Sequence, residues 1–127
     1  MLEKRKDIRY REMGHVDCPQ ICALSGVLED ISISGVKVHF PCPIILDDSK
    51  EYDLKLKMSQ KPKMEAITVS CKMEWSQVED SQTTFGFRII KCDNKKLLEE
   101  YIDFLKKSSQ DDDIEDMIPI TGPVFVK

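Results

Sequence analysis

The chain has 127 residues and a formal net charge of −4, with 33% charged and 41% apolar residues. This length suits one domain with short extensions, and the composition is that of a water-soluble globular protein. No apolar run approaches the ~20 residues needed to cross a bilayer, and the charged start lacks the apolar segment of a secretory signal, so we expect a cytoplasmic protein without membrane insertion.

Residues 1–19 are charged and show no regular pattern, so we expect a flexible basic arm. Arg5 and Arg9 are four residues apart, which allows both guanidinium groups to reach one ligand. Each guanidinium offers a rigid fork of donors that matches phosphate oxygens or the O6/N7 edge of guanine. Such a pair taken alone is more often a solvated run of charges.

Two β-like runs, over residues 21–30 and 35–40, meet at a turn that contains Asp30, Ser32 and Gly35. Asp and Ser favour turns because they bond nearby backbone N–H groups, and Gly because it accepts positive φ. A carboxylate, hydroxyls and backbone N–H groups gathered at one place can form a small-molecule site. The alternative is a hairpin turn without a ligand, because turn chemistry alone explains these residues.

Three further strands are predicted over 52–58, 67–75 and 85–89, where apolar and polar residues alternate, with a polar loop over 76–82. Trp75 is either a core residue, from its parity with Met73 and Cys71, or an aromatic platform for a bound base. Successive strands without helices between them imply an antiparallel sheet curled into a sandwich or small barrel.

A helix is predicted over 93–107, capped by Asp93 or Asn94. Its apolar stripe is expected to close one end of the barrel and consists of Leu97, Leu98, Tyr101, Ile102 and Leu105. Residues 108–127 form an acidic and apolar tail. This tail is either a solvated extension or an acidic shield over Arg5 and Arg9.

We expect the five cysteines to be reduced, buried thiols, because their number is odd and no two are spaced as Cys-x-x-Cys. His15, Cys18 and Cys22 match no common zinc spacing, so neither a metal site nor a cofactor is predicted. These residues also lack an orienting group and an oxyanion site, so no enzyme activity is expected. The basic residues are confined to a short segment, which favours a local anionic ligand over DNA.

The motifs Arg5-x-x-x-Arg9 and Asp30-x-Ser32-x-x-Gly35, in this order, resemble the two signatures of the PilZ domain family. The resemblance runs from about Glu3 to about Lys107. It implies a mainly β fold, a six-stranded antiparallel β-barrel of the split-barrel type with a C-terminal α-helix. The implied PilZ domain covers residues 1–107, with the arm at 1–19, the barrel at 20–92 and the helix at 93–107, and leaves the tail 108–127 uncovered.

The resemblance also implies a function, because the two signatures form the site for the bacterial second messenger cyclic di-GMP. It assigns five positions to this ligand: Arg5, Arg9, Asp30, Ser32 and Gly35. Lys4 and Trp75 are second-tier candidates, and the residue at position 4 influences whether one or two nucleotides bind.

A receptor of this kind, either a monomer or a ligand-dependent dimer, would close its basic arm over the nucleotide. It would then act on an unidentified effector protein in signal transduction, with outputs such as motility, biofilm formation, exopolysaccharide production or virulence. The alternative is a nucleotide-independent protein-interaction module of the PilZ fold.

Overall fold

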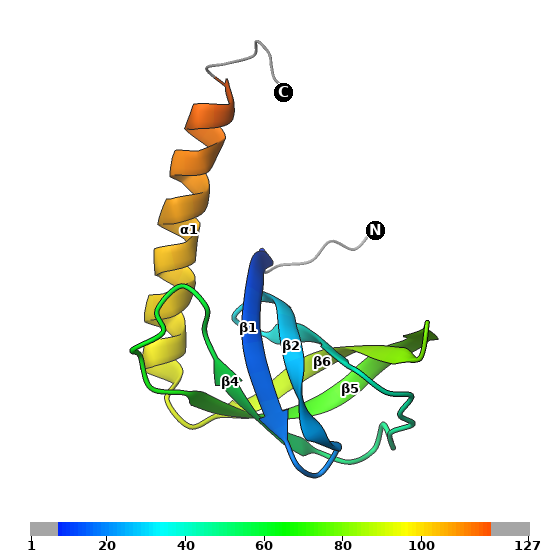
Figure 1. The fold of residues 1–127 in the computed structure, drawn as a ribbon. Coiled ribbons are helices and arrows are strands. Elements are labelled where there is room, and N and C mark those ends of the chain that lie inside the picture. The colour runs from blue at the N-terminus through cyan, green and yellow to red at the C-terminus, as the bar shows by residue number, and fades with distance from the viewer. Residues whose placement is uncertain (1–7, 118–127) are drawn as a thin grey trace, which may run out of the picture.

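The structure is a computed structural model that describes residues 8–117, with side chains described through residue 108. Six strands close into a ring in the order β1-β2-β3-β6-β5-β4, and all neighbouring pairs are antiparallel (Figure 1). We call this ring the barrel. Its elements are β1 (Tyr10–Cys18), β2 (Cys22–Ile31), β3 (Gly35–Phe40), β4 (Tyr52–Lys57), β5 (Ile67–Glu79), β6 (Gln82–Cys92) and the helix α1 (Lys95–Met117). The predicted mainly β class with a C-terminal helix is therefore confirmed.

The core fills the inside of the barrel with side chains from alternate strand positions. Leu28, Val38 and Leu54 are completely buried, as expected for strands with one apolar face. Phe85 joins neighbouring parts of this core, because its ring contacts Phe40 edge-on at 6.2 Å and Phe87 at 5.4 Å between centroids. The rigid core fixes the register of the strands that carry the two motifs.

Residues 10–18 form β1, so the expected flexible arm over 1–19 is wrong for these residues, and the barrel begins at Tyr10 rather than at residue 20. Every second residue of β1 is buried, but two of these inward positions are Glu12 and Gly14, which hid the alternation in the sequence. The Glu12 carboxylate accepts hydrogen bonds from the Tyr101 hydroxyl and the Ser59 N–H, both at 2.5 Å. A buried carboxylate is tolerated here because donors surround it.

The predicted loop over 76–82 is also wrong, because β5 continues to Glu79 and β6 begins at Gln82. Asp80 and Ser81 make the two-residue turn between them with φ values of 54° and 64°. Residues 74–82 are exposed, so the hairpin lacks the one-sided apolar alternation by which strands are recognised in a sequence.

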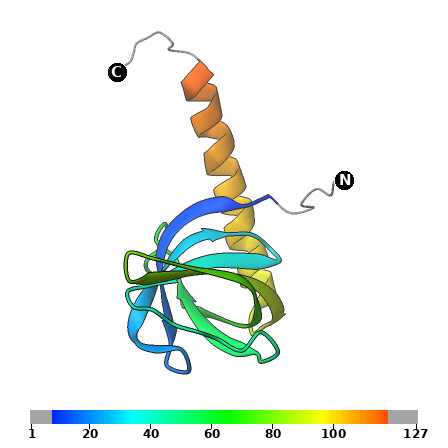
Figure 2. The ribbon, with the colours of Figure 1, turned by 90° about the vertical axis from the view of Figure 1, so that its right-hand side faces the viewer.

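The helix α1 begins after Asn94, whose side chain accepts the Leu97 N–H at 3.1 Å as an N-cap. Its buried residues Leu98, Tyr101 and Leu105 pack against the barrel, and Figure 2 shows the helix continuing well beyond it. The helix extends to Met117 rather than to residue 107, because no glycine or proline interrupts the chain before Pro119. Residues 108–117 are therefore helical rather than tail, and 118–127 lie outside the described residues.

Within residues 8–117, no helix combines the length and the apolar character that a membrane span requires.

Candidate functional site

The two sequence motifs meet at an ion pair between Arg9 and Asp30. Arg9 directly precedes β1, and Asp30 lies on β2 opposite Arg11 in the β1–β2 ladder. The distance from Arg9 Nη1 to Asp30 Oδ1 is 2.6 Å, and the two side chains are 24% and 23% exposed. Because a guanidinium has five N–H donors, Asp30 can hold Arg9 in place and leave several donors for a ligand.

Ser32 shapes the turn between β2 and β3. Its hydroxyl oxygen accepts the N–H groups of Gly35 at 3.0 Å and of Ser34 at 3.3 Å, and its own N–H donates to the Gly35 carbonyl at 2.8 Å. The residue is only 2% exposed. The Ser32 side chain therefore makes its hydrogen bonds within the turn. Its main contribution to ligand binding would be to fix the backbone beside Arg9.

Gly35 is required by close approach and not by its backbone conformation. No glycine in the described part of the chain has positive φ, so the expectation that Gly35 supplies one is wrong. A Cβ atom at Gly35 would instead lie 2.8 Å from the Phe87 carbonyl oxygen and 3.3 Å from Arg9 Nη2. The absent side chain is what lets β6 and the Arg9 guanidinium approach this position.

A small cavity of about 170 Å³ opens at this point, and its lining includes residues from both motifs together with a second ion pair. It is lined by Arg9, Ser32, Ser34, Gly35, Glu74, Phe87 and Arg88. The Arg88 Nε lies 3.3 Å from Glu74 Oε2, and both side chains are about half exposed. Typical small-molecule pockets hold ~300–1,000 Å³, so a dinucleotide would enter only in part and would rest mainly on the outer surface.

Glu74 was missed as a site residue, whereas the sequence left Arg88 open as a strand position that faces either a ligand or solvent. They lie on β5 and β6 and reach the motif only because Gly35 pairs with Arg88 across β3 and β6. The one signal in the sequence was that Arg88 alternates with apolar residues and so faces outward.

Trp75 lies on the outer face of the barrel, so the alternative that places it in the core is wrong. A register shift between Met73 and Trp75 reverses the expected parity, and Trp75 is 41% exposed. Its indole covers Gly86, where a Cβ atom would lie 2.1 Å from the indole Nε1. Gly86 is two residues from Arg88 along β6, which corresponds to about 7 Å.

Arg5 and Lys4 lie outside the described residues, so the structure does not place them.

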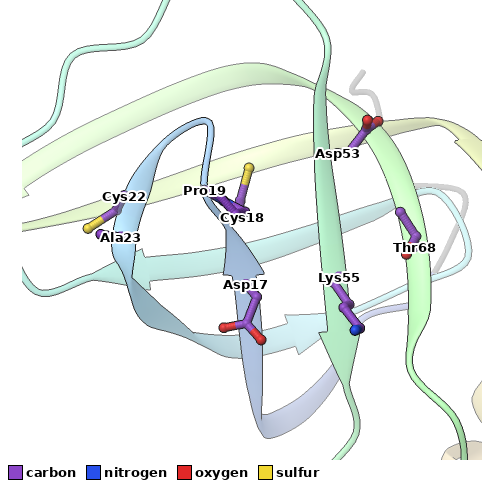
Figure 3. A pocket seen from close by; sticks show the side chains of 8 residues that line it. All are labelled: Asp17, Cys18, Pro19, Cys22, Ala23, Asp53, Lys55 and Thr68. Carbon is purple, nitrogen blue, oxygen red and sulfur yellow. The ribbon is translucent and has the colours of Figure 1, made fainter.

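A larger depression of about 510 Å³ lies at the other end of β1 and β2, around the turn that joins them (Figure 3). It is lined by Asp17, Cys18, Pro19, Cys22, Ala23, Asp53, Lys55 and Thr68. None of the predicted ligand residues that the structure describes contributes to it. Desolvation raises the pKa of the buried Cys18 thiol.

The fold defines one class of protein, a small antiparallel β-barrel domain followed by a helix. The PilZ domain profile matches residues 3–104, and the chain belongs to the PilZ domain family. Among solved structures, the fold is similar to that of the Bacillus subtilis inhibitor of motility (MotI/DgrA), with a TM-score of 0.69 and 9% identity. The similarity covers 87% of this chain and 53% of that protein, so this chain spans about half of its length. No curated protein matches the sequence.

Proposed function

We propose that this protein is a receptor for cyclic di-GMP, which binds at Arg5, Arg9, Asp30, Ser32 and Gly35, and that the bound state regulates a partner protein. The observation that carries this proposal is the 2.6 Å ion pair between Arg9 and Asp30, since it joins the two motifs beside the cavity at Gly35. Membership of the PilZ family supports it, because that family contains cyclic di-GMP receptors.

The chemistry of the ligand matches the charges around the cavity. Each phosphate of cyclic di-GMP needs cationic donors. Arg9 offers them from a position that Asp30 holds, and Arg5, four residues earlier in the sequence, would add more. Arg88 contributes a further guanidinium to the cavity lining, where a phosphate would compete with its partner Glu74. A guanine base that lies outside the cavity could stack on the half-exposed indole of Trp75.

Regulation would follow from the position of Arg5 in the chain. A phosphate bound by both Arg5 and Arg9 draws the segment before β1 onto the outer surface of the barrel. This rearrangement would change the surface offered to an effector protein. The protein would thus act in the cytoplasm as a binding module and not as an enzyme. The name of the Bacillus subtilis inhibitor of motility makes motility one output to test.

Calorimetric titration with cyclic di-GMP tests the proposal on the wild type, Arg9→Ala and Arg11→Ala. Arg11 is the matched control, because it is an exposed arginine two residues away, and no ion pair joins it to another described residue. A charge-assisted hydrogen bond contributes ~1.5–3 kcal/mol, so Arg9→Ala should weaken binding by at least about tenfold. Arg11→Ala should stay within about twofold of the wild type.

The titration also distinguishes a cyclic di-GMP receptor from a nucleotide-independent interaction module. No heat with the wild type would favour the nucleotide-independent interaction module. Binding that is equally strong in Arg9→Ala would place the nucleotide away from the motif and contradict the proposed site.

A further inference from the structure

Two of the five cysteines have adjacent sulfur atoms. The Sγ atoms of Cys22 and Cys42 are 3.5 Å apart, and both side chains are partly exposed. All five cysteines belong to the described part of the chain, and within it no other pair of thiols lies within hydrogen-bonding distance. The closeness was not evident in the sequence, because twenty residues separate the two positions.

The backbone on both sides of this contact is anchored. Cys22 opens β2 and pairs with Cys18 across the β1–β2 ladder. Cys42 follows the end of β3, and its carbonyl oxygen accepts a hydrogen bond from the Thr83 hydroxyl at 2.8 Å. The two sulfurs are therefore held next to each other by the fold and not by a chance orientation of loose loops.

We propose that Cys22 and Cys42 form a reversible intramolecular disulfide when the protein meets a hydroperoxide. A disulfide needs a separation of ~2.04 Å between sulfur atoms, so the two atoms must approach by about 1.5 Å, which small rotations about the side-chain bonds can supply. The larger depression described above is lined by Cys22 and gives a small oxidant access to it. The proposal does not depend on nucleotide binding.

The chemistry proceeds in two balanced steps. The Cys22 thiolate attacks one oxygen of hydrogen peroxide, the O–O bond breaks, and a sulfenic acid and hydroxide form. The Cys42 thiol then loses its proton and its sulfur attacks the Cys22 sulfur. The S–O bond breaks, and the hydroxyl group leaves with that proton as water. In total, two thiols and one peroxide give one disulfide and two water molecules, and the two electrons that the sulfurs lose reduce the peroxide.

The order of these steps follows from access, because Cys22 lines the depression and Cys42 does not. The hydrogen bond with Cys22 is the main reason that the pKa of Cys42 is raised, so Cys42 is the less reactive of the two thiols toward peroxide and reacts second. The other three cysteines are protected, because desolvation raises the pKa of Cys18, of Cys71 and of Cys92. Thiols that stay protonated react slowly with peroxide.

The bridge would enclose β2, the motif turn and β3 in one covalent loop. Closing a loop of this length restricts the unfolded chain, so the oxidised protein should unfold at a thermal midpoint at least about 5 °C higher than the reduced protein. Because Cys22 and Asp30 lie at opposite ends of β2, about 27 Å apart along the strand, oxidation should leave the nucleotide site in place.

The test uses the full chain, first reduced and then treated with one equivalent of hydrogen peroxide. Denaturing alkylation and mass spectrometry should show three modified cysteines instead of five and a peptide that joins Cys22 to Cys42, both reversed by dithiothreitol. Cys22→Ser and Cys42→Ser should abolish the bridge, whereas Cys92→Ser, another partly exposed cysteine, should retain it. In Cys42→Ser, dimedone should trap a sulfenic acid at Cys22.

Several results would overturn the proposal. These are five alkylated cysteines after peroxide treatment, a bridge between any other pair, or a disulfide that joins two chains. Circular dichroism confirms that each serine variant is folded, so loss of the bridge in a variant cannot be attributed to unfolding.

Discussion

Replacing Gly35 with alanine should damage nucleotide binding more than any comparable change elsewhere in the barrel. The new methyl group would lie 2.8 Å from the Phe87 carbonyl oxygen and 3.3 Å from Arg9 Nη2, whereas ordinary contacts begin at 3.4 Å. The shortfall of 0.6 Å against a backbone atom forces β3 away from β6. Such overpacking costs ~1–3 kcal/mol, or about 4–8 °C in thermal midpoint for each kcal/mol.

The affinity should fall because the same methyl group displaces the Arg9 guanidinium. We expect at least a tenfold loss for cyclic di-GMP in calorimetry at 20 °C, where the variant stays folded. Gly26→Ala is the matched control, since its Cβ would lie 2.8 Å from the His39 carbonyl oxygen, far from Arg9. That Cβ would also lie 2.8 Å from the Phe40 ring, so the variant should lose at least as much stability and keep its affinity. Wild-type affinity in Gly35→Ala, or an equal loss in both variants, would refute the reasoning.

Four further predictions concern the core, the pH dependence of stability, the indole and the salt dependence of binding. Tyr101→Phe should lower the free energy of unfolding in urea by about 1.5–3 kcal/mol. The change removes a donor from the buried Glu12 carboxylate and leaves the Gln60 N–H without its acceptor. A loss below about 0.5 kcal/mol would contradict this. Burial, and then the hydrogen bond to Glu12, raise the pKa of Tyr101. Above about pH 10 the unfolded chain therefore loses this proton before the folded protein does, so the free energy of unfolding should fall as pH rises. Constant stability there would count against the buried bond between Tyr101 and Glu12. Trp75 is the single tryptophan, so cyclic di-GMP should change the fluorescence and Trp75→Ala should weaken binding several-fold, whereas an unchanged spectrum at saturation would remove the indole from the site. Raising NaCl from 50 to 500 mM should weaken binding by about threefold or more, and an affinity independent of salt would argue against arginine–phosphate contacts.

The strands with one apolar face could be predicted from the sequence, and β3 has the predicted bounds of 35–40. Strand β1 could not, because its inward positions include a glycine and the carboxylate of Glu12. That carboxylate is stable inside the protein only through donors from Ser59 and Tyr101, which are distant in sequence. Local alternation carries no information about such partners, so a polar residue in the core makes a strand look like a loop.

The meeting of Arg9 with Asp30 was expected only from the family resemblance and not from their spacing. The cavity lining was harder to foresee, because Glu74 and Arg88 reach Gly35 through the long-range pairing of β3, β5 and β6. The outward position of Trp75 depends on a register shift, which reverses every parity argument beyond it. Pairings and bulges are properties of the closed sheet, so they become visible only in three dimensions.

The most direct test of the account is a titration of ¹⁵N-labelled protein with cyclic di-GMP, followed by amide chemical shifts. The account predicts saturable shifts that cluster at Arg9, at residues 30–35 and near Trp75 and Arg88, with the depression beside Cys22 unaffected. The absence of shifts at millimolar nucleotide, or shifts confined to surfaces away from Arg9 and Gly35, would contradict the proposal that the two motifs form one nucleotide site.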